Sequence, residues 1–122
     1  MCSGLLAWQS IFFGSAPDTV LSVANINGDD VVGLFHQGTL VDVFGQLGVD
    51  GTGTPWEYMD GWAYRVDSTG PNATFTLSEW TFSGINALDN STSNSNANPA
   101  FPFNTYNLGG GGSNPNTSTP TY

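Results

Sequence analysis

Residues 31–44 read VVGLFHQGTLVDVF, and this stretch decides the fold class. Two runs rich in β-branched and aromatic residues, 31–36 and 39–44, flank the dipeptide Gln37-Gly38. A two-residue connection that contains glycine is typical of a β-hairpin, because glycine accepts the positive φ that the tight turn requires. The stretch therefore predicts two antiparallel strands.

Further strand signals lie on both sides of this hairpin. Residues 19–23 and 62–67 alternate apolar and polar side chains, and 74–77 is a short run with β propensity. Residues 78–82 are expected to form another strand or the segment that closes the core, while the glycines of 45–55 predict a long loop. Helical spacing is nearly absent, so we predict an all-β, immunoglobulin-like β-sandwich of short antiparallel strands.

The chain is acidic and poor in charge. The chain has ten Asp and Glu residues and one Arg or Lys, Arg65, which gives a formal net charge of −9. Binding to nucleic acid needs several Lys or Arg side chains, so the composition argues against nucleic acid as a partner and against a basic membrane-surface helix. The length of 122 residues and the 39% hydrophobic content predict one domain with a real core, and no apolar run predicts a transmembrane segment.

Cysteine and asparagine usage bear on location. Cys2 is the only cysteine, so no intramolecular disulfide can form. A lysine-free sequence rich in Asn, Ser, Thr and Gly is typical of proteins outside the cell, and we predict an extracellular or cell-surface location. Three sequons are candidate N-glycosylation sites in a glycosylating host, at Asn72, Asn90 and Asn116.

The familiar catalytic constellations are missing from the sequence. His36 is the only histidine, which leaves no histidine-based zinc cluster, and no Gly-x-Ser-x-Gly elbow is present. A carboxylate pair for glycoside hydrolysis, Glu57 with Glu79 or Asp60, stays open as an alternative. We predict that the chain is not an enzyme and carries no cofactor.

Carboxylates beside the hairpin are candidates for a metal site. Asn27-Gly28-Asp29-Asp30 precedes the hairpin and Asp50 follows it, so their oxygens could converge on Ca²⁺. The spacing does not match an EF-hand loop, and Asn-Gly-Asp also predicts a turn whose side chains bond nearby backbone N–H groups. We favour the turn.

Arg65 is predicted to be structural. A lone base in mid-strand is expected to form a bidentate pair with a neighbouring carboxylate, for which Asp42 is the first candidate and Glu79 the second. The nearby aromatics could stack on sugar rings, but we favour core positions for them: Trp56, Tyr58 and Trp62.

The composition divides the chain into three segments. Residues 1–19 are an apolar N-terminal segment, 20–87 the β-sandwich, and 88–122 a polar, low-complexity tail rich in Gly, Asn, Ser and Thr. Within the tail, 89–98 lacks the apolar surface to order itself. The tail also contains three aromatic anchors, Phe101, Phe103 and Tyr106.

The run NGDDVVGLFHQGTLVDVFGQLG (27–48), followed by Trp56, the strand holding Arg65 and the pair Glu79-Trp80, resembles the lamin-tail domain. It is most similar to the version found in secreted bacterial proteins, including extracellular nucleases and phosphatases, and the likeness covers roughly 20–82. The resemblance implies an immunoglobulin-like sandwich without its own catalytic centre, used for attachment or interaction. The residues assigned a structural role are Asn27, Gly28, Asp42, Gly45, Arg65 and Trp80.

The family's usual opening strands are not recognisable in residues 1–18. A sandwich without them would leave a sheet edge open to pairing with another chain, and residues 1–19 are a candidate exchanged strand. We therefore predict a structural or adhesive module that forms a homo-oligomer or a filament. The alternatives are an accessory domain of a secreted hydrolase and a Ca²⁺- or carbohydrate-binding module.

Overall fold

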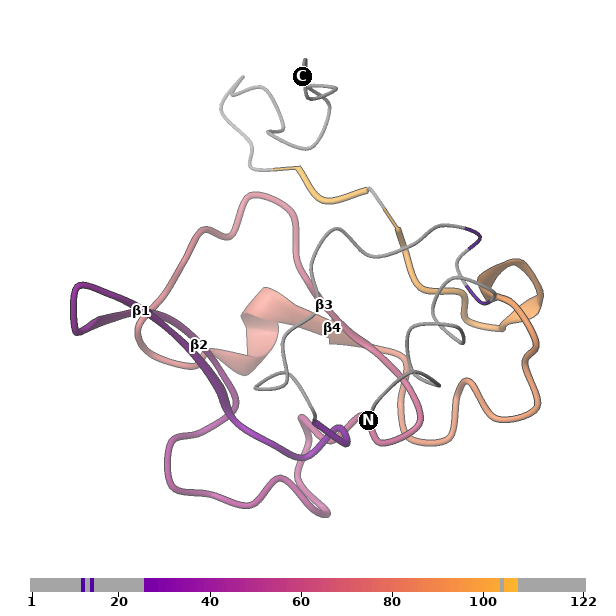
Figure 1. The fold of residues 1–122 in the computed structure, drawn as a ribbon, viewed down its shortest axis with the longest axis horizontal. Helices are drawn as coiled ribbons and strands as arrows, with labels where there is room; N and C mark the ends of the chain where they lie inside the picture. Colours follow the sequence, from indigo (N-terminus) through magenta and orange to yellow (C-terminus); the bar gives the residue numbers. More distant parts are fainter. Residues whose placement is uncertain (1–11, 13, 15–25, 104, 108–122) are drawn as a thin grey trace, which may run out of the picture.

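The computed structural model describes residues 12, 14, 26–103 and 105–107 (Figure 1). Within residues 26–103 and 105–107 the regular structure consists of two small antiparallel sheets and two short 3₁₀ helices, which confirms a β-rich fold. The strand predicted for 19–23 and most of the segment 1–19 lie outside the described residues. Among the helices of the described part, none has the length and apolar character needed to cross a membrane.

Strands β1 (Val32–His36) and β2 (Thr39–Phe44) form the predicted hairpin. Both turn residues have positive φ, 50° at Gln37 and 79° at Gly38, as a two-residue hairpin turn of the mirror-image type requires. Figure 1 shows the hairpin turn pointing away from the rest of the chain.

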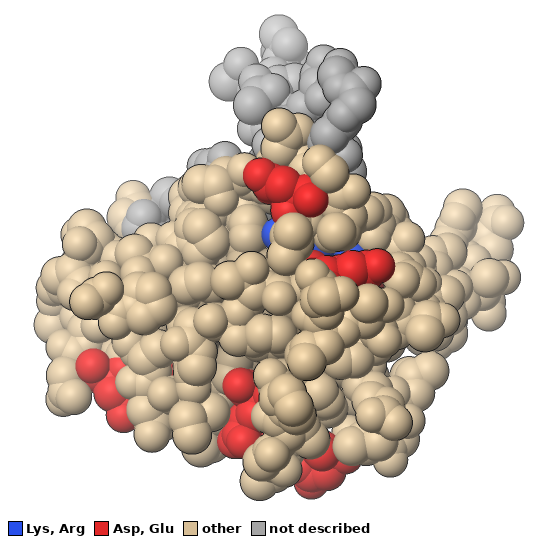
Figure 2. Space-filling model, turned by 180° about the vertical axis from the view of Figure 1, so that it is seen from behind, with Lys and Arg blue, Asp and Glu red and all other residues tan. Residues whose placement is uncertain are grey.

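All five residues of β1 are exposed. Leu34 is 60% exposed and Phe35 62%, and the sequence from Val32 to Val41 contains no Asp, Glu, Lys or Arg. From behind, the part of the surface that projects at the right is free of acidic and basic side chains, whereas acids appear at several places on the main body (Figure 2). Strand β1 and the turn therefore form an exposed projection that carries no Asp, Glu, Lys or Arg on an acidic protein.

The second sheet pairs β3 (Ala63–Arg65) with β4 (Trp80–Phe82), and Arg65 lies opposite Trp80. The 3₁₀ helix η2 (Leu77–Glu79) leads directly into β4. The strand expected at 62–67 is thus shorter, while 78–82 supplies the end of a helix and then a strand.

The prediction of a strand at 74–77 is wrong, because residues 74–76 form no strand and Leu77 begins η2. The side chain of Asn72 accepts a hydrogen bond from the backbone N–H of Thr74, and the carbonyl of Thr76 accepts one from Glu79. These local bonds turn the chain before it can pair with a neighbouring strand.

Phe44 lies at the centre of the main aromatic cluster. Its ring is 4.8 Å from that of Trp80 and 5.8 Å from that of Trp56, both in edge-to-face geometry. The predicted loop at 45–55 is confirmed, since it contains neither strand nor helix and wraps around Trp56. Five apolar side chains of the described residues are buried: Phe12, Val43, Phe44, Trp56 and Ala97.

The expectation that residues 89–98 do not order is wrong. They contain the 3₁₀ helix η3 (Asn94–Asn96), which Ser93 and Asn96 close in a capping box. The side chain of Asn94 also bonds the backbone N–H and carbonyl of Phe101, at 2.7 and 2.9 Å. Amide side chains therefore supply by hydrogen bonding what the segment lacks in apolar surface.

The aromatic anchor Phe101 docks this segment on the second sheet. Its ring lies 5.2 Å from that of Tyr64 and 6.0 Å from that of Trp62, and the indole N–H of Trp62 donates to the carbonyl of Pro99. Residues 88–103 are thus held by the body of this same chain.

Candidate functional site

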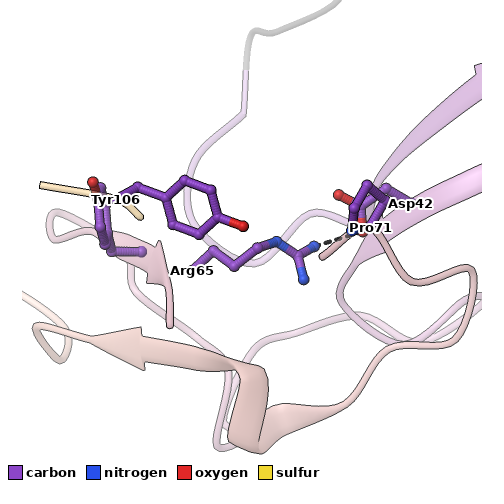
Figure 3. Close-up of a pocket in the computed structure, with 5 residues that line it drawn as sticks. Asp42, Arg65, Pro71 and Tyr106 are labelled. Carbon is purple, nitrogen blue, oxygen red and sulfur yellow. Dashed lines mark hydrogen bonds and ion pairs between the residues drawn. The ribbon is translucent and has the colours of Figure 1, made fainter. Parts of the chain in front are cut away.

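The side chain of Arg65 is the centre of a polar network between the two sheets. Nη2 lies 2.5 Å from Oδ1 of Asp42, and Nη1 lies 3.4 Å from Oε2 of Glu79 (Figure 3 shows the first contact). Nη1 also donates to the carbonyl of Gly70 at 3.1 Å, and the guanidinium carbon stands 4.3 Å from the ring centroid of Trp80.

Both candidate partners of Arg65 are therefore bound at once. The predicted contact with Asp42 is present, but the expected bidentate geometry is not, because the guanidinium divides its two ends between Asp42 and Glu79. The side chain of Arg65 is only 12% exposed and each carboxylate side chain 23%. The arrangement connects β2 with β3 and with the end of η2.

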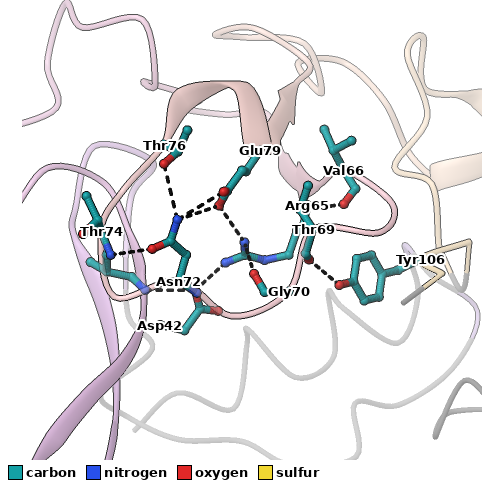
Figure 4. A network of polar contacts seen from close by, with 11 residues as sticks. Asp42, Arg65, Val66, Thr69, Gly70, Asn72, Thr74, Thr76, Glu79 and Tyr106 are labelled. Carbon is teal, nitrogen blue, oxygen red and sulfur yellow. Dashed lines mark hydrogen bonds and ion pairs between the residues drawn. The ribbon is translucent and has the colours of Figure 1, made fainter. Parts of the chain in front are cut away.

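Asn72 completes this network, and sequence reasoning missed its role. Its backbone N–H donates to Oδ1 of Asp42 at 3.0 Å, and its side-chain amide donates to Oε1 of Glu79 at 3.1 Å (Figure 4). The backbone carbonyl of Asn72 accepts a hydrogen bond from the backbone N–H of Val43 at 3.0 Å. The sequence analysis marked Asn72 only as a sequon, and the dipeptide Pro71-Asn72 a few residues after the sole base was the one available signal.

A hollow of about 250 Å³ opens beside the Arg65–Asp42 pair (Figure 3). Tyr64, Pro71 and Tyr106 complete its lining. The phenol of Tyr106 donates to the carbonyl of Thr69 at 2.6 Å. An ion pair and two aromatic side chains thus surround one space, a combination that the sequence did not predict because Tyr106 lies in the tail.

The acidic turn before the hairpin has the local bonding expected of a turn. Asp30 accepts the N–H of Asn27 at 3.2 Å, Asp29 accepts the hydroxyl of Thr52 at 3.1 Å, and Asp50 accepts the N–H of Thr52 at 2.9 Å. Hydrogen bonds from Thr52 hold the pKa of Asp50 below its ordinary value.

The three acids line one hollow of about 330 Å³. However, nowhere in residues 26–103 and 105–107 do three acidic, histidine or cysteine side chains approach closely enough to hold a metal ion. Burial, with smaller contributions from the charges of Asp30 and Asp29, raises the pKa of the neighbouring Tyr58 above its ordinary value.

The other candidate residues lie in separate structural contacts. Glu57 accepts the N–H of Gly53 at 2.6 Å, whereas Glu79 belongs to the Arg65 network. Asp60 is exposed at a turn residue with φ of 50°, and His36 is exposed at the end of β1.

The aromatics considered for sugar stacking occupy packing positions. Trp56 is only 4% exposed, the ring of Tyr58 packs edge-on against Phe44, and Trp62 contacts Phe101. The interpretation of these residues as packed is thus supported, and a flat stacking surface formed by the three is not present.

The structure distinguishes between the candidate glycosylation sites. The amide of Asn72 is occupied by hydrogen bonds to Glu79 and Thr76, whereas Asn90 is exposed in a turn with φ of 64°. Asn116 and Cys2 lie outside the described residues.

Comparisons with known proteins add no relative. The sequence matches no protein-family model and no curated protein, and the structure matches no solved one.

Proposed function

We propose that this chain is a non-enzymatic, extracellular interaction module that associates with copies of itself through strand β1. The single observation that carries the proposal is the exposure of all five residues of β1, a strand that contains no Asp, Glu, Lys or Arg. An extracellular location is supported by the lysine-free composition, and the structural role of the module by a polar network whose members bond one another.

An immunoglobulin-like sandwich of the lamin-tail type is the architecture that we propose for the module. Packing between the two small sheets supports it, because Phe44 of β2 lies 4.8 Å from the ring of Trp80 and 6.1 Å from that of Phe82 in β4. Side chains from two facing sheets interdigitate in this way in β-sandwiches.

Strand β1 has the properties of a pairing edge. Within the described residues β1 pairs only with β2, and we propose that the backbone groups on its other side bind a further strand. Natural edge strands usually carry charged residues that discourage such pairing, and β1 has none.

A second copy of this chain is the partner that we propose for the edge. Two molecules with a net charge of −9 repel each other least where the contact avoids their acids, and β1 is such a surface. A basic partner would gain little by docking on this uncharged strand. Antiparallel pairing of two β1 strands would give a closed dimer, whereas pairing of β1 with another segment would give a filament.

The test is the mass of the particle in solution, measured by light scattering over a range of concentrations. We expect the native chain to form particles larger than the 12.9 kDa monomer. The double variant Leu34→Glu, Phe35→Glu should be monomeric, because it places like charges at the edge. Ile85→Glu is the matched control, since Ile85 is 53% exposed but lies outside the hairpin.

Two results would contradict the proposal. One is a native chain that stays monomeric at every concentration, and the other is a double variant that assembles as well as the native chain. Near-ultraviolet circular dichroism of each variant shows whether the core is intact, so that loss of assembly is not confused with unfolding.

A further inference from the structure

We propose that the hollow beside Arg65 and Asp42 binds an organic ammonium group, such as the head of a quaternary amine or the end of a lysine side chain. This inference concerns a different surface from the β1 edge and goes beyond assembly. It depends on three observations: the aromatic walls of the hollow, the charge at its base and the size of the space.

Aromatic side chains form two walls of the hollow. The rings of Tyr64 and Tyr106 have centroids 6.5 Å apart and planes inclined at 76°, so they form a corner rather than a stack. Pro71 contributes a further apolar wall. Aromatic corners of this kind attract cations, especially alkylammonium groups, through the negative faces of the rings.

The charge at the base of the hollow favours a cation. Asp42 and Arg65, which line the hollow, carry opposite charges, and Glu79, which contacts the guanidinium but does not line the hollow, brings the formal charge of the three residues to −1. Oδ1 of Asp42 accepts three hydrogen bonds, from Val43, Arg65 and Asn72, whereas Oδ2 accepts none from the described residues. Oδ2 is the oxygen of Asp42 that we assign to contact with the ammonium group.

The net negative charge of the whole chain strengthens the preference of the hollow for a cation. A net charge of −9 raises the concentration of cations near the surface, and the chain has no lysine that could occupy the hollow. The volume of about 250 Å³ is below the range of roughly 300–1,000 Å³ typical of sites for drug-sized ligands. A compact ammonium group fits such a space better than an extended ligand.

Binding can be followed by amide chemical shifts in two-dimensional NMR of the isotope-labelled full chain. The probes are choline and a lysine whose backbone groups are blocked. Each is compared with its neutral isostere, in which carbon replaces the ammonium nitrogen. We expect saturable chemical-shift changes confined to residues around the hollow. The neutral isosteres should bind with at least about fivefold lower affinity, because the positive charge supplies the attraction. Preference for one probe identifies the source, a quaternary amine or a protein side chain.

Variants separate the hollow from the rest of the surface. Tyr64→Leu removes one aromatic wall and should lower the affinity for the ammonium probe by about three- to fivefold. Tyr106→Leu tests the other wall without changing a strand, which keeps the proposal testable if Tyr64→Leu does not fold. Phe35→Leu, which removes an exposed ring from the hairpin, is the matched control and should bind as the native chain does.

The proposal is overturned if neither ammonium probe shifts the residues around the hollow, or if the neutral isosteres bind equally well. It is also overturned if the folded Tyr64 and Tyr106 variants bind as tightly as the Phe35 control. Phe35 lies in β1 and does not line the hollow. The binding test therefore distinguishes failure of the hollow proposal from failure of the assembly proposal.

Discussion

Nη2 of Arg65 lies 2.5 Å from Oδ1 of Asp42, so one guanidinium connects β3 of the second sheet to β2 of the first. The other end of the guanidinium contacts Glu79, and Trp80 covers its face. Because all the side chains in this contact are mostly shielded from water, its loss should cost more than that of a surface ion pair.

Arg65→Ala should lower the free energy of unfolding by about 2–3 kcal/mol, somewhat less than the roughly 3–5 kcal/mol found for fully buried pairs. The alanine variant leaves Asp42 and Glu79 without their cation. Arg65→Lys should be intermediate, since lysine keeps the charge but lacks the planar fork that reaches both carboxylates. Urea unfolding measures both values.

The exposed Asp89 is the control for this comparison, and Asp89→Asn should change the stability by less than about 0.5 kcal/mol. An Arg65→Ala variant as stable as the Asp89 control would show that the network contributes nothing to the fold.

The sequence was most informative where the signal was local. The hairpin around Gln37 and Gly38 was predictable because a two-residue turn and the apolar runs beside it point to the same structure. The two carboxylate partners of Arg65 were also predictable, since a single base in mid-strand among ten acids is expected to pair with a neighbouring carboxylate. The number of carboxylates that it binds depends on tertiary geometry.

Predictions were wrong where polar side chains replaced apolar packing. The amide of Asn72 bonds the backbone two residues later and turns a segment with strand propensity. Asn94 bonds both backbone groups of Phe101, which orders a segment whose composition resembles that of disordered chains. Composition counts the apolar surface of a segment but does not show which amide side chains find partners.

Close packing beneath Trp56 leads to a second prediction. A Cβ atom at Gly51 would lie 2.5 Å from Cη2 of Trp56 and 2.6 Å from the carbonyl oxygen of Asp29. Gly51→Ala should therefore force the loop or the indole to move, with a cost of about 1–3 kcal/mol. The measurement is the urea midpoint together with the tryptophan fluorescence of the folded state.

Gly70→Ala is the matched control for this substitution. A Cβ atom there would have no neighbour within 4 Å, and the variant should be neutral or up to about 1 kcal/mol more stable, because alanine restricts the unfolded chain. Equal stability of the Gly51 and Gly70 variants would contradict the close packing of Gly51 against Trp56.

The raised pKa of Tyr58 predicts a loss of stability in alkaline solution. The folded chain holds the phenol proton more tightly than the unfolded chain, so the contribution is fully present below pH 10.0, the ordinary value. It is lost as the pH rises through the higher pKa of the folded state. Tyr58→Phe should reduce the fall in unfolding free energy above pH 10.0, which urea unfolding at a series of pH values measures.

The phenolate absorbance of the folded protein provides an independent check on Tyr58. The native chain should contain a tyrosine that ionises at higher pH than in the urea-unfolded chain, and Tyr58→Phe should remove that step. An unchanged pH dependence in the variant would show that the neighbouring Asp29 and Asp30, together with burial, do not control the alkaline transition.

The central position of Phe44 leads to the last prediction. Its side chain is 7% exposed and packs against the rings of Trp56, Phe75 and Trp80. Phe44→Ala should lower the free energy of unfolding by about 3–5 kcal/mol, a large part of the roughly 5–15 kcal/mol of a domain of this size. Phe35→Ala, which truncates a ring that is 62% exposed, should cost less than about 1 kcal/mol when both variants are measured as monomers. Similar losses for the two variants would contradict a core centred on Phe44, and they would also weaken the case for two sheets that pack through this ring.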